Sequence, residues 1–254
     1  MKIPPGLRLA FGLLSVFPVR FEDADRRTFA SAMAWSPVVG LVIGVCQALT
    51  GAGLRWAGAS WLLAAAVSLA AGAVLTRALH LDGLADVADG LGSGKPPEEA
   101  QAVMKRSDIG PFGVITLLFT LLIQAAALSS ARHQALVVIV AAVAGRVAIA
   151  WACTPGNRAA RADGLGASVA QSVPLRVAAL LTAALLVLTA LVTLLWTRDA
   201  ETVLLVTLAP AVALLSADLF RRHLIRRFDG VTGDVLGALC ELAVTLTLVV
   251  AVLG

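Results

Sequence analysis

The sequence predicts an all-α, polytopic membrane helix bundle with about seven transmembrane helices. Composition is the first observation behind this prediction. The chain has 254 residues, of which 59% are hydrophobic and 14% are charged, and its mean hydropathy is +0.90. Soluble domains carry about 25% charged residues and about 45–50% apolar ones. This chain therefore has too little polar surface to cover a water-soluble globule.

Apolar runs are the second observation. Crossing about 30 Å of hydrocarbon takes about 20 helical residues. Runs of that length cover residues 34–54, 60–79, 112–131, 135–153, 177–196, 202–220 and 235–253. The segment before them holds a shorter apolar stretch without a cleavage signal, which predicts a retained interfacial helix. We expect one integral-membrane domain over residues 1–254.

The loop cations predict the orientation of the bundle. Four alternate segments outside the spans carry five, three, three and four Lys or Arg residues. The intervening loops carry one each, namely Arg55, Arg132 and Arg198. By the positive-inside rule, this split of fifteen to three places the N-terminus in the cytoplasm. The basic charge is therefore a topology signal, and we expect no nucleic-acid partner. The three cysteines lie in apolar segments and offer neither a disulfide framework nor metal-ligand spacing.

An acidic stretch, HLDGLADVADG at residues 80–90, follows the second run. Asp82, Asp86 and Asp89 are spaced i, i+4, i+7, which places them within roughly 60° of one another on a helix. Three like charges on one face repel, and a divalent cation removes that repulsion. Hard carboxylate ligands suit Mg²⁺ together with water and substrate phosphates. The alternative is a solvated acidic helix end. His80 could bind phosphate or orient a carboxylate, or it could be a hydrogen-bonded anchor.

Two further stretches fall on the same predicted membrane face. Lys105, Arg106 and Asp108, in MKRSDIGPFG, suit a phosphate-contacting turn, although ordinary flanking charge is an equally good interpretation. RRFDGVTGDVLGALCEL places Asp229, Thr232 and Asp234 in a Gly-rich turn at a helix N-terminus, which suits anions.

Charged side chains also fall within the predicted spans. Glu241 lies seven residues after Asp234, about 10 Å deeper on the same face. A carboxylate inside the membrane is costly and marks a functional candidate or a buried partner for an arginine. We favour pairing with Arg146 or Arg77. Taken together, the residues predict a divalent-metal carboxylate site with phosphate contacts, typical of phosphoryl transfer.

These motifs closely resemble those of the cobalamin synthase family, the adenosylcobinamide-GDP ribazoletransferases. HLDGLADVADG resembles the family signature, and TGDVLGALCEL at 232–242 is the second specific match. SVFPVR at 15–20, PVVGLVIG at 37–44, MKRSDIGPFGV at 104–114 and DGLG at 163–166 are supportive. In the motif at 104–114, the family usually has Asp before Ser and Arg after it. Here the order is Arg106-Ser107-Asp108, so the two groups either exchange places or one is not needed. Val244 stands where a second acid is frequent.

The resemblance implies transfer of the cobinamide phosphate of adenosylcobinamide-GDP to α-ribazole or its 5′-phosphate, with release of GMP and with Mg²⁺ as cofactor. We expect Asp82 and Asp86 to hold the metal, with Asp89 as a further ligand or as the base. His80, Lys105, Arg106, Asp108, Asp229, Thr232 and Asp234 are the expected substrate contacts. Membrane lipid is the expected surrounding, at the plasma (inner) membrane with the site on the cytoplasmic face. A homo-oligomer is compatible with the sequence.

Two alternatives remain open at this level. The acidic motif is also similar to that of CDP-alcohol phosphotransferases, which act on lipid acceptors. Asp86 stands where those enzymes usually carry arginine, which argues against this alternative. An ion or metal transporter would carry its acids near mid-membrane on several spans, whereas most acids here lie at one face.

Overall fold

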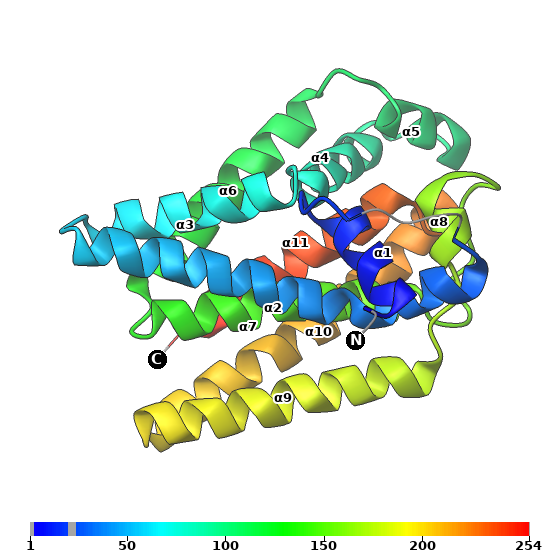
Figure 1. Cartoon of the computed structure of the whole chain (residues 1–254). Helices are drawn as coiled ribbons and strands as arrows, with labels where there is room; N and C mark the ends of the chain where they lie inside the picture. Colours follow the sequence, from blue (N-terminus) through cyan, green and yellow to red (C-terminus); the bar gives the residue numbers. More distant parts are fainter. Residues whose placement is uncertain (1–2, 20–23, 254) are drawn as a thin grey trace.

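The structure is a computed structural model that describes residues 3–19 and 24–253, and its elements are helices joined by short loops (Figure 1). Lys2 and Arg20, two of the cations counted above, lie outside the described residues. The helices are α1 (Pro5–Leu14), α2 (Arg26–Trp56), α3 (Trp61–Leu75), α4 (Leu79–Gly92), α5 (Pro97–Met104), α6 (Pro111–Ser130), α7 (Gln134–Ala152), α8 (Gly164–Val169), α9 (Leu175–Thr197), α10 (Ala200–Phe228) and α11 (Gly233–Val250).

Six of these helices are long and apolar enough to cross a membrane, which confirms a polytopic membrane helix bundle. They are α2, α6, α7, α9, α10 and α11. The second predicted run does not form one straight helix. It breaks after α3, and α4 turns by 90° from it, so that the count reaches seven if the bent pair is one span. The break has a backbone cause, because Arg77 and Ala78 both adopt a positive φ of 54°, which a right-handed helix cannot contain.

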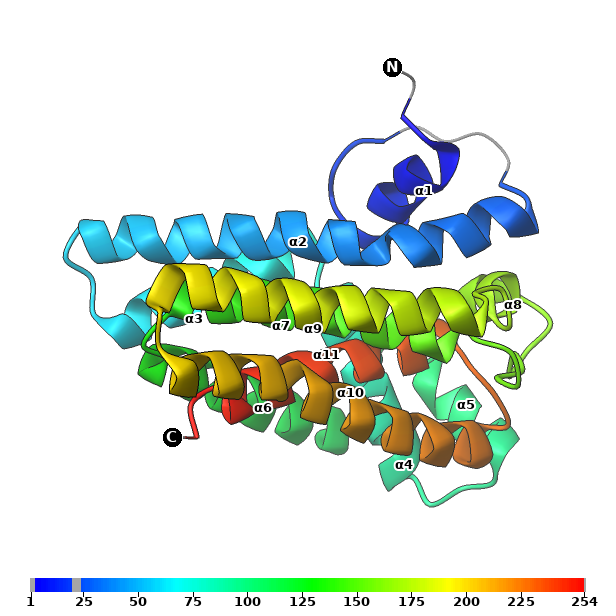
Figure 2. The ribbon, with the colours of Figure 1, turned by 90° about the horizontal axis from the view of Figure 1, so that it is seen from below.

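α7 forms the centre of the bundle and packs against α2 and α11. Small residues allow the close approach. A Cβ added to Gly40 of α2 would lie 2.6 Å from the carbonyl oxygen of Ala142 on α7, and one added to Gly44 would lie 2.8 Å from the Cα of Ile139. This spacing of small residues is the usual device for helix packing in membranes. The hairpin of α9 and α10 covers one side of this core (Figure 2).

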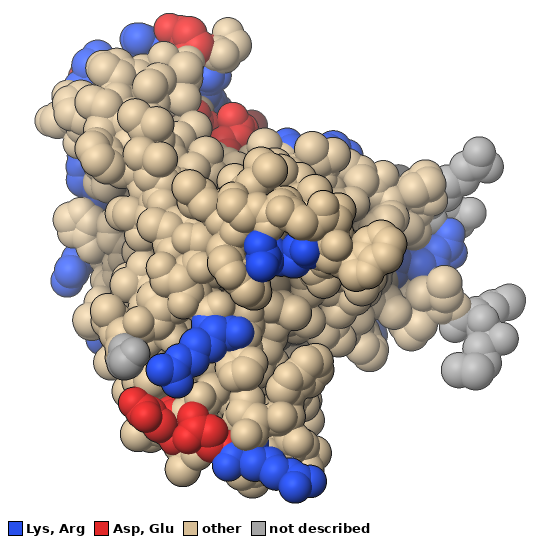
Figure 3. Space-filling view, turned by 90° about the vertical axis from the view of Figure 1, so that its left-hand side faces the viewer, with Lys and Arg blue, Asp and Glu red and all other residues tan. Residues whose placement is uncertain are grey.

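The two ends of the bundle differ. One end holds α1, α4, α5 and α8, together with the ends of α7 and α10 and the beginnings of α2, α9 and α11 (Figures 1 and 2). The opposite end faces the viewer in Figure 3, where most of the surface is uncharged. α2, with 31 residues, is about 46 Å long, so it extends past a hydrocarbon layer of about 30 Å.

α1 is the helix that the sequence predicts near the N-terminus. It packs along α2 rather than standing apart, and its apolar side chains Leu9 and Leu14 are buried. A Cβ added to Gly6 would overlap the side chain of Ser31, so glycine permits this contact. α1 therefore forms part of the wall at the end of the bundle that carries α4.

Candidate functional site

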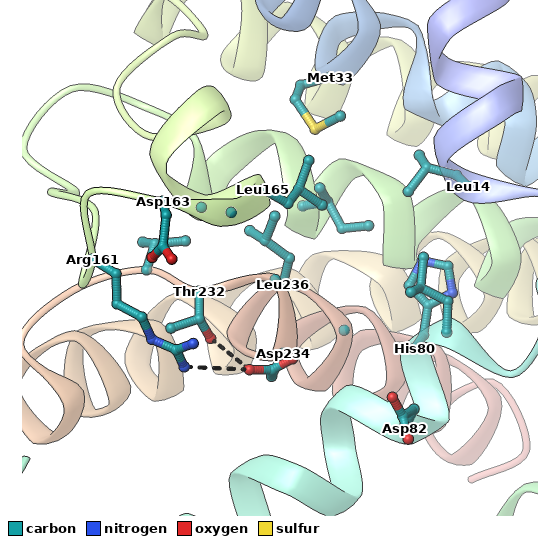
Figure 4. A pocket seen from close by; sticks show the side chains of 17 residues that line it. Leu14, Met33, His80, Asp82, Arg161, Asp163, Leu165, Thr232, Asp234 and Leu236 are labelled. Carbon is teal, nitrogen blue, oxygen red and sulfur yellow. Dashed lines mark hydrogen bonds and ion pairs between the residues drawn. The ribbon is translucent and has the colours of Figure 1, made fainter. Parts of the chain in front are cut away.

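A cavity of about 290 Å³ opens where α1, α2, α4, α7, α8 and α11 meet, at the end of the bundle that holds α4 (Figure 4). Its polar lining comes from three segments that are far apart in the sequence. α4 contributes His80 and Asp82, the turn before α11 contributes Thr232 and Asp234, and the loop before α8 contributes Arg161 and Asp163. The structure therefore brings together acids and a cation that the sequence places about 80 and 150 positions apart.

The acidic face of α4 runs from the cavity into the protein. Asp82 is exposed, Asp86 is half-buried and Asp89 is 7% exposed. Two glycines set the distance between α4 and α11: a Cβ added to Gly83 would lie 2.8 Å from the carbonyl oxygen of Asp234. One added to Gly237 would lie 3.1 Å from the carbonyl oxygen of His80. This close crossing is what places Asp82 beside Asp234.

Asp89, expected as a metal ligand or as the base, instead contacts the backbone at the beginning of α6. Its carboxylate accepts hydrogen bonds from the backbone N–H groups of Gly110 (2.7 Å) and Gly113 (2.9 Å). These groups belong to the first turn of α6, whose N–H groups lack partners within the helix. Asp89 does not line the cavity. The structure thus gives this side chain a capping role, which a negative charge at a helix N-terminus fulfils well.

The turn before α11 is held by its own side chains and by a neighbouring loop. Thr232 Oγ1 accepts a hydrogen bond from the N–H of Val235 (3.2 Å) and donates one to Asp234 Oδ2 (3.2 Å). The backbone of Val231 bonds to Arg158 and Ala160 on the loop after α7. Both loops are therefore fixed relative to each other at the mouth of the cavity.

Arg161 is the residue that the sequence analysis missed. Its Nη2 lies 4.0 Å from Asp234 Oδ2 (Figure 4). Its Nε donates to Gln101 Oε1 at 2.9 Å, and Gln101 in turn donates to the carbonyl oxygen of Phe228 at 2.7 Å. Among the described residues, nothing accepts a hydrogen bond from the buried Nη2. The guanidinium is thus oriented by Gln101 and has a free donor at the cavity, which suits a phosphate oxygen.

Four of the expected substrate contacts lie elsewhere. Lys105, Arg106 and Asp108 are exposed in the connection between α5 and α6, outside the cavity lining. Asp229 ends α10 with a positive φ of 62° and pairs with Arg158, where both side chains are mostly exposed. The structure therefore brings His80, Thr232 and Asp234 to the cavity with Asp82, and does not bring these four there.

The carboxylates fit Mg²⁺ by their chemistry. The charges of Asp234, Asp82 and Asp89 all act on Asp86, and a cation would offset this repulsion. Among the described residues, no three His, Cys, Asp or Glu side chains form a ready set of metal ligands. Mg²⁺ is commonly held by one or two carboxylates with water and substrate phosphates. Asp82 lines the cavity and would supply one ligand of such a site, and Asp86, one turn further along α4, is half-buried and outside the cavity lining.

Glu241 accepts a hydrogen bond from Gln124 Nε2 on α6 (3.0 Å), and Gln124 also donates to Thr245 (2.9 Å). Arg146, which is 4% exposed, lines a second, smaller cavity together with Glu241 and Gln124, and its charge acts on Glu241. Arg77 lies elsewhere, near the carbonyl groups at the end of α1. Glu241 thus has Gln124 as its direct partner, which a search for arginines alone could not find.

Comparison with known proteins points to one family. The family described as cobalamin-5-phosphate synthase matches residues 6–252. An adenosylcobinamide-GDP ribazoletransferase of Frankia casuarinae is 41% identical, covering 96% of this chain and 92% of the relative. Proteins of the same name from a Nocardioides species and from Corynebacterium efficiens are each 37% identical and cover 95% and 92% of this chain, and 95% and 86% of the relatives. No solved structure matches the chain.

Proposed function

Because the chain belongs to the cobalamin-5-phosphate synthase family, we propose that it transfers the cobinamide phosphate of adenosylcobinamide-GDP to α-ribazole or its 5′-phosphate. The names of relatives that match nearly the whole chain support this reaction. The observation that carries it at the level of the site is the cavity lined by Asp82, Asp234 and Arg161, with Arg161 Nη2 4.0 Å from Asp234 Oδ2. Such a pairing of carboxylates with a guanidinium suits a pyrophosphate and its metal.

The reaction exchanges the phosphoanhydride bond of the donor for a phosphodiester bond. A ribose hydroxyl of α-ribazole attacks the phosphorus next to cobinamide, a new P–O bond forms, and the bond from that phosphorus to the GMP oxygen breaks. The hydroxyl proton must be removed and the leaving GMP must be stabilised. These demands are met by positioning and by charge, because little covalent chemistry falls to the protein in phosphoryl transfer.

Each residue has one role in the proposal. Asp82 and Asp86 would hold Mg²⁺, which would neutralise the charge of the pyrophosphate and of the leaving GMP. Arg161 contacts a phosphate oxygen through its free Nη2. Asp234, which lies at the cavity 4.0 Å from Arg161, takes the place of Asp89 as the acceptor of the hydroxyl proton. Thr232 fixes the carboxylate of Asp234 through its hydrogen bond.

We place the site at the cytoplasmic face of the plasma (inner) membrane. The support is that cations concentrate at the end of the bundle that carries the cavity, at the beginning of α2, in the loop between α7 and α8 and near the end of α10, among them Arg26, Arg158, Arg161 and Arg222. The opposite end carries Arg55, Arg132 and Arg198. The positive-inside rule then assigns the cavity end to the cytoplasm.

The test is transfer by the purified full-length protein in lipid nanodiscs. Adenosylcobinamide-GDP and α-ribazole, with Mg²⁺, should give GMP and adenosylcobalamin, quantified by chromatography. Asp82→Asn should abolish GMP release, whereas Asp108→Asn, an exposed acid away from the cavity, should not change it. No transfer by the wild-type protein would refute the proposed function. Full activity of Asp82→Asn would refute the role of the cavity. Turnover of a CDP-alcohol without release of GMP from adenosylcobinamide-GDP would favour the lipid-acceptor alternative.

A further inference from the structure

The wall of the cavity away from the acids is apolar. Leu14 of α1, Met33 of α2, Ile149 of α7 and Leu236 of α11 line it, with exposed fractions of 3%, 0%, 1% and 3%. These side chains belong to the hydrophobic core and reach the cavity from four different helices. They offer no hydrogen bonds to a sugar or a phosphate. A wall of this kind suits a flat apolar group, whose burial is favourable.

His80 is the polar exception beside this wall (Figure 4). It is 3% exposed and lines the cavity near Leu14. In the part of the chain that the structure describes, its buried Nε2 has no hydrogen-bond partner. The backbone at His80 is held by the close crossing with Gly237. An unpaired polar atom in such a place is destabilising, and a ligand that pairs with it removes that cost.

The volume limits what enters. At about 290 Å³, the cavity lies at the lower end of the range of about 300–1,000 Å³ typical of ligand pockets. A nucleoside base with part of its sugar is of the right size, and a corrin ring is not. Both proposed substrates carry such a base, but guanine has several polar edge groups that these apolar side chains cannot pair, so the base of the acceptor is the one that this wall fits.

We infer that the base of α-ribazole lies against Leu14, Met33, Ile149 and Leu236, and that its unsubstituted ring nitrogen accepts a hydrogen bond from His80 Nε2–H. This inference rests on the proposed function and assigns the acceptor subsite. A benzimidazole has a flat, apolar bicyclic surface and one free ring nitrogen with a lone pair, which matches the apolar wall and the unpaired His80 Nε2 beside it. The arrangement places the ribose toward Asp82 and Asp234, and His80 and Met33 become determinants of acceptor choice.

The experiment compares two acceptors that differ at one atom. In the indole riboside, a C–H group replaces the ring nitrogen of the benzimidazole riboside. Transfer is measured with the full-length protein in nanodiscs, with one substrate saturating while the other is varied. For the wild-type protein, KM should be about tenfold higher for the indole riboside, the loss expected for one hydrogen bond of about 1.4 kcal/mol. His80→Phe, which keeps a ring but has no donor, should remove this difference.

Matched variants separate the hydrogen bond from structural damage. His80→Gln keeps an N–H donor and should restore part of the discrimination. Neither variant should change KM for adenosylcobinamide-GDP. Met33→Ala should raise KM more for the riboside of dimethylated benzimidazole than for the riboside of unsubstituted benzimidazole. Leu136→Ala, at the other end of α7, should not change that preference.

The outcomes distinguish the two proposals. Absence of transfer with every acceptor refutes the proposed function. Transfer with equal KM for the indole and benzimidazole ribosides refutes the acceptor subsite and leaves the function intact. A difference that persists unchanged in His80→Phe also refutes the role of His80. If His80→Phe does not fold, the comparison of the two ribosides on the wild-type protein still decides whether the ring nitrogen is recognised.

Discussion

Asp89 Oδ2 lies 2.7 Å from the backbone nitrogen of Gly110, at the first turn of α6. Together with the bond from Gly113, this contact joins the acidic helix α4 to a spanning helix. The last aspartate of the acidic face is therefore a capping group, and the reactive end of α4 is the end that carries Asp82.

Replacing Asp89 by alanine should lower stability more than it changes the chemical step. Loss of an N-cap costs about 0.5–2 kcal/mol, and here two N–H groups lose their acceptor. We expect a lower apparent Tm in detergent, with KM for both substrates within a factor of a few. Asp108→Ala, at an exposed acid of the neighbouring loop, is the matched control. An Asp89→Ala protein with unchanged Tm and no turnover would instead identify Asp89 as the base.

Arg161→Ala should weaken the use of adenosylcobinamide-GDP. A hydrogen bond to a charged group contributes about 1.5–3 kcal/mol, so kcat/KM should fall by about 10- to 100-fold. Arg161→Lys should recover little, because an ammonium lacks the planar donor geometry. Gln101→Leu should give a smaller loss, since Gln101 only orients the guanidinium. Arg158→Ala serves as the control, and equal effects of Arg158→Ala and Arg161→Ala would argue against a phosphate contact at Arg161.

The spanning helices could be predicted from the sequence, and the site could be predicted only in part. Hydropathy marks α6, α7, α9, α10 and α11 because lipid requires long apolar helices. The break between α3 and α4 depends on two residues with positive φ, Arg77 and Ala78. Neither is glycine or asparagine, so no residue type signals the bend.

The composition of the site shows the same limit. The spacing of Asp82 and Asp86 indicates an acidic helix face because helical periodicity is local. The contact between Arg161 and Gln101 joins residues 60 positions apart, and no local pattern encodes it. The exposed cations Lys105 and Arg106 resemble a phosphate site in sequence, yet the connection between α5 and α6 carries them away from the cavity. A Gly-rich loop with an arginine, here RADGLG, was the available signal for Arg161.

Metal removal should stop transfer. We expect chelation by EDTA to abolish GMP release and Mg²⁺ to restore it, because Asp86 is half-buried and the charges of Asp234, Asp82 and Asp89 act together on it, a repulsion that a cation would offset. Asp86→Asn should raise the Mg²⁺ concentration needed for half-maximal activity, and Asp218→Asn, at an acid outside the cavity, should not. Full activity in EDTA would contradict the assigned metal.

Glu241 should prove to be a structural residue. Glu241→Ala leaves Gln124 without its carboxylate acceptor inside the membrane, which should cost about 1–3 kcal/mol and lower the apparent Tm. Glu241→Gln keeps an acceptor oxygen and should lose less. KM for both substrates and the Mg²⁺ requirement should not change in either variant. Glu201→Gln, at an exposed acid of the opposite end, is the control. A Glu241→Gln protein with wild-type Tm but no turnover would show a direct role in the reaction.

Gly83→Ala should reduce activity by moving α4 away from α11. The added Cβ would lie 2.8 Å from the carbonyl oxygen and 2.9 Å from the Cα of Asp234, closer than Cβ atoms come to backbone. The two helices must separate, and Asp82 then moves relative to Asp234. A displacement of about 1 Å at reacting groups can cost about a hundredfold in rate, so kcat should fall at least tenfold.

Gly53 of α2 provides the matched control for this prediction, because a Cβ added there meets nothing within 4 Å. Gly53→Ala should keep full activity and, since alanine loses less chain entropy than glycine in a helix, could gain up to about 1 kcal/mol of stability. Wild-type kcat in Gly83→Ala would mean that the distance between α4 and α11 does not set the position of Asp82. Loss of activity in Gly83→Ala with an unchanged Tm and an unchanged KM for both substrates would place the effect in the chemical step, as the alignment of Asp82 with Asp234 requires.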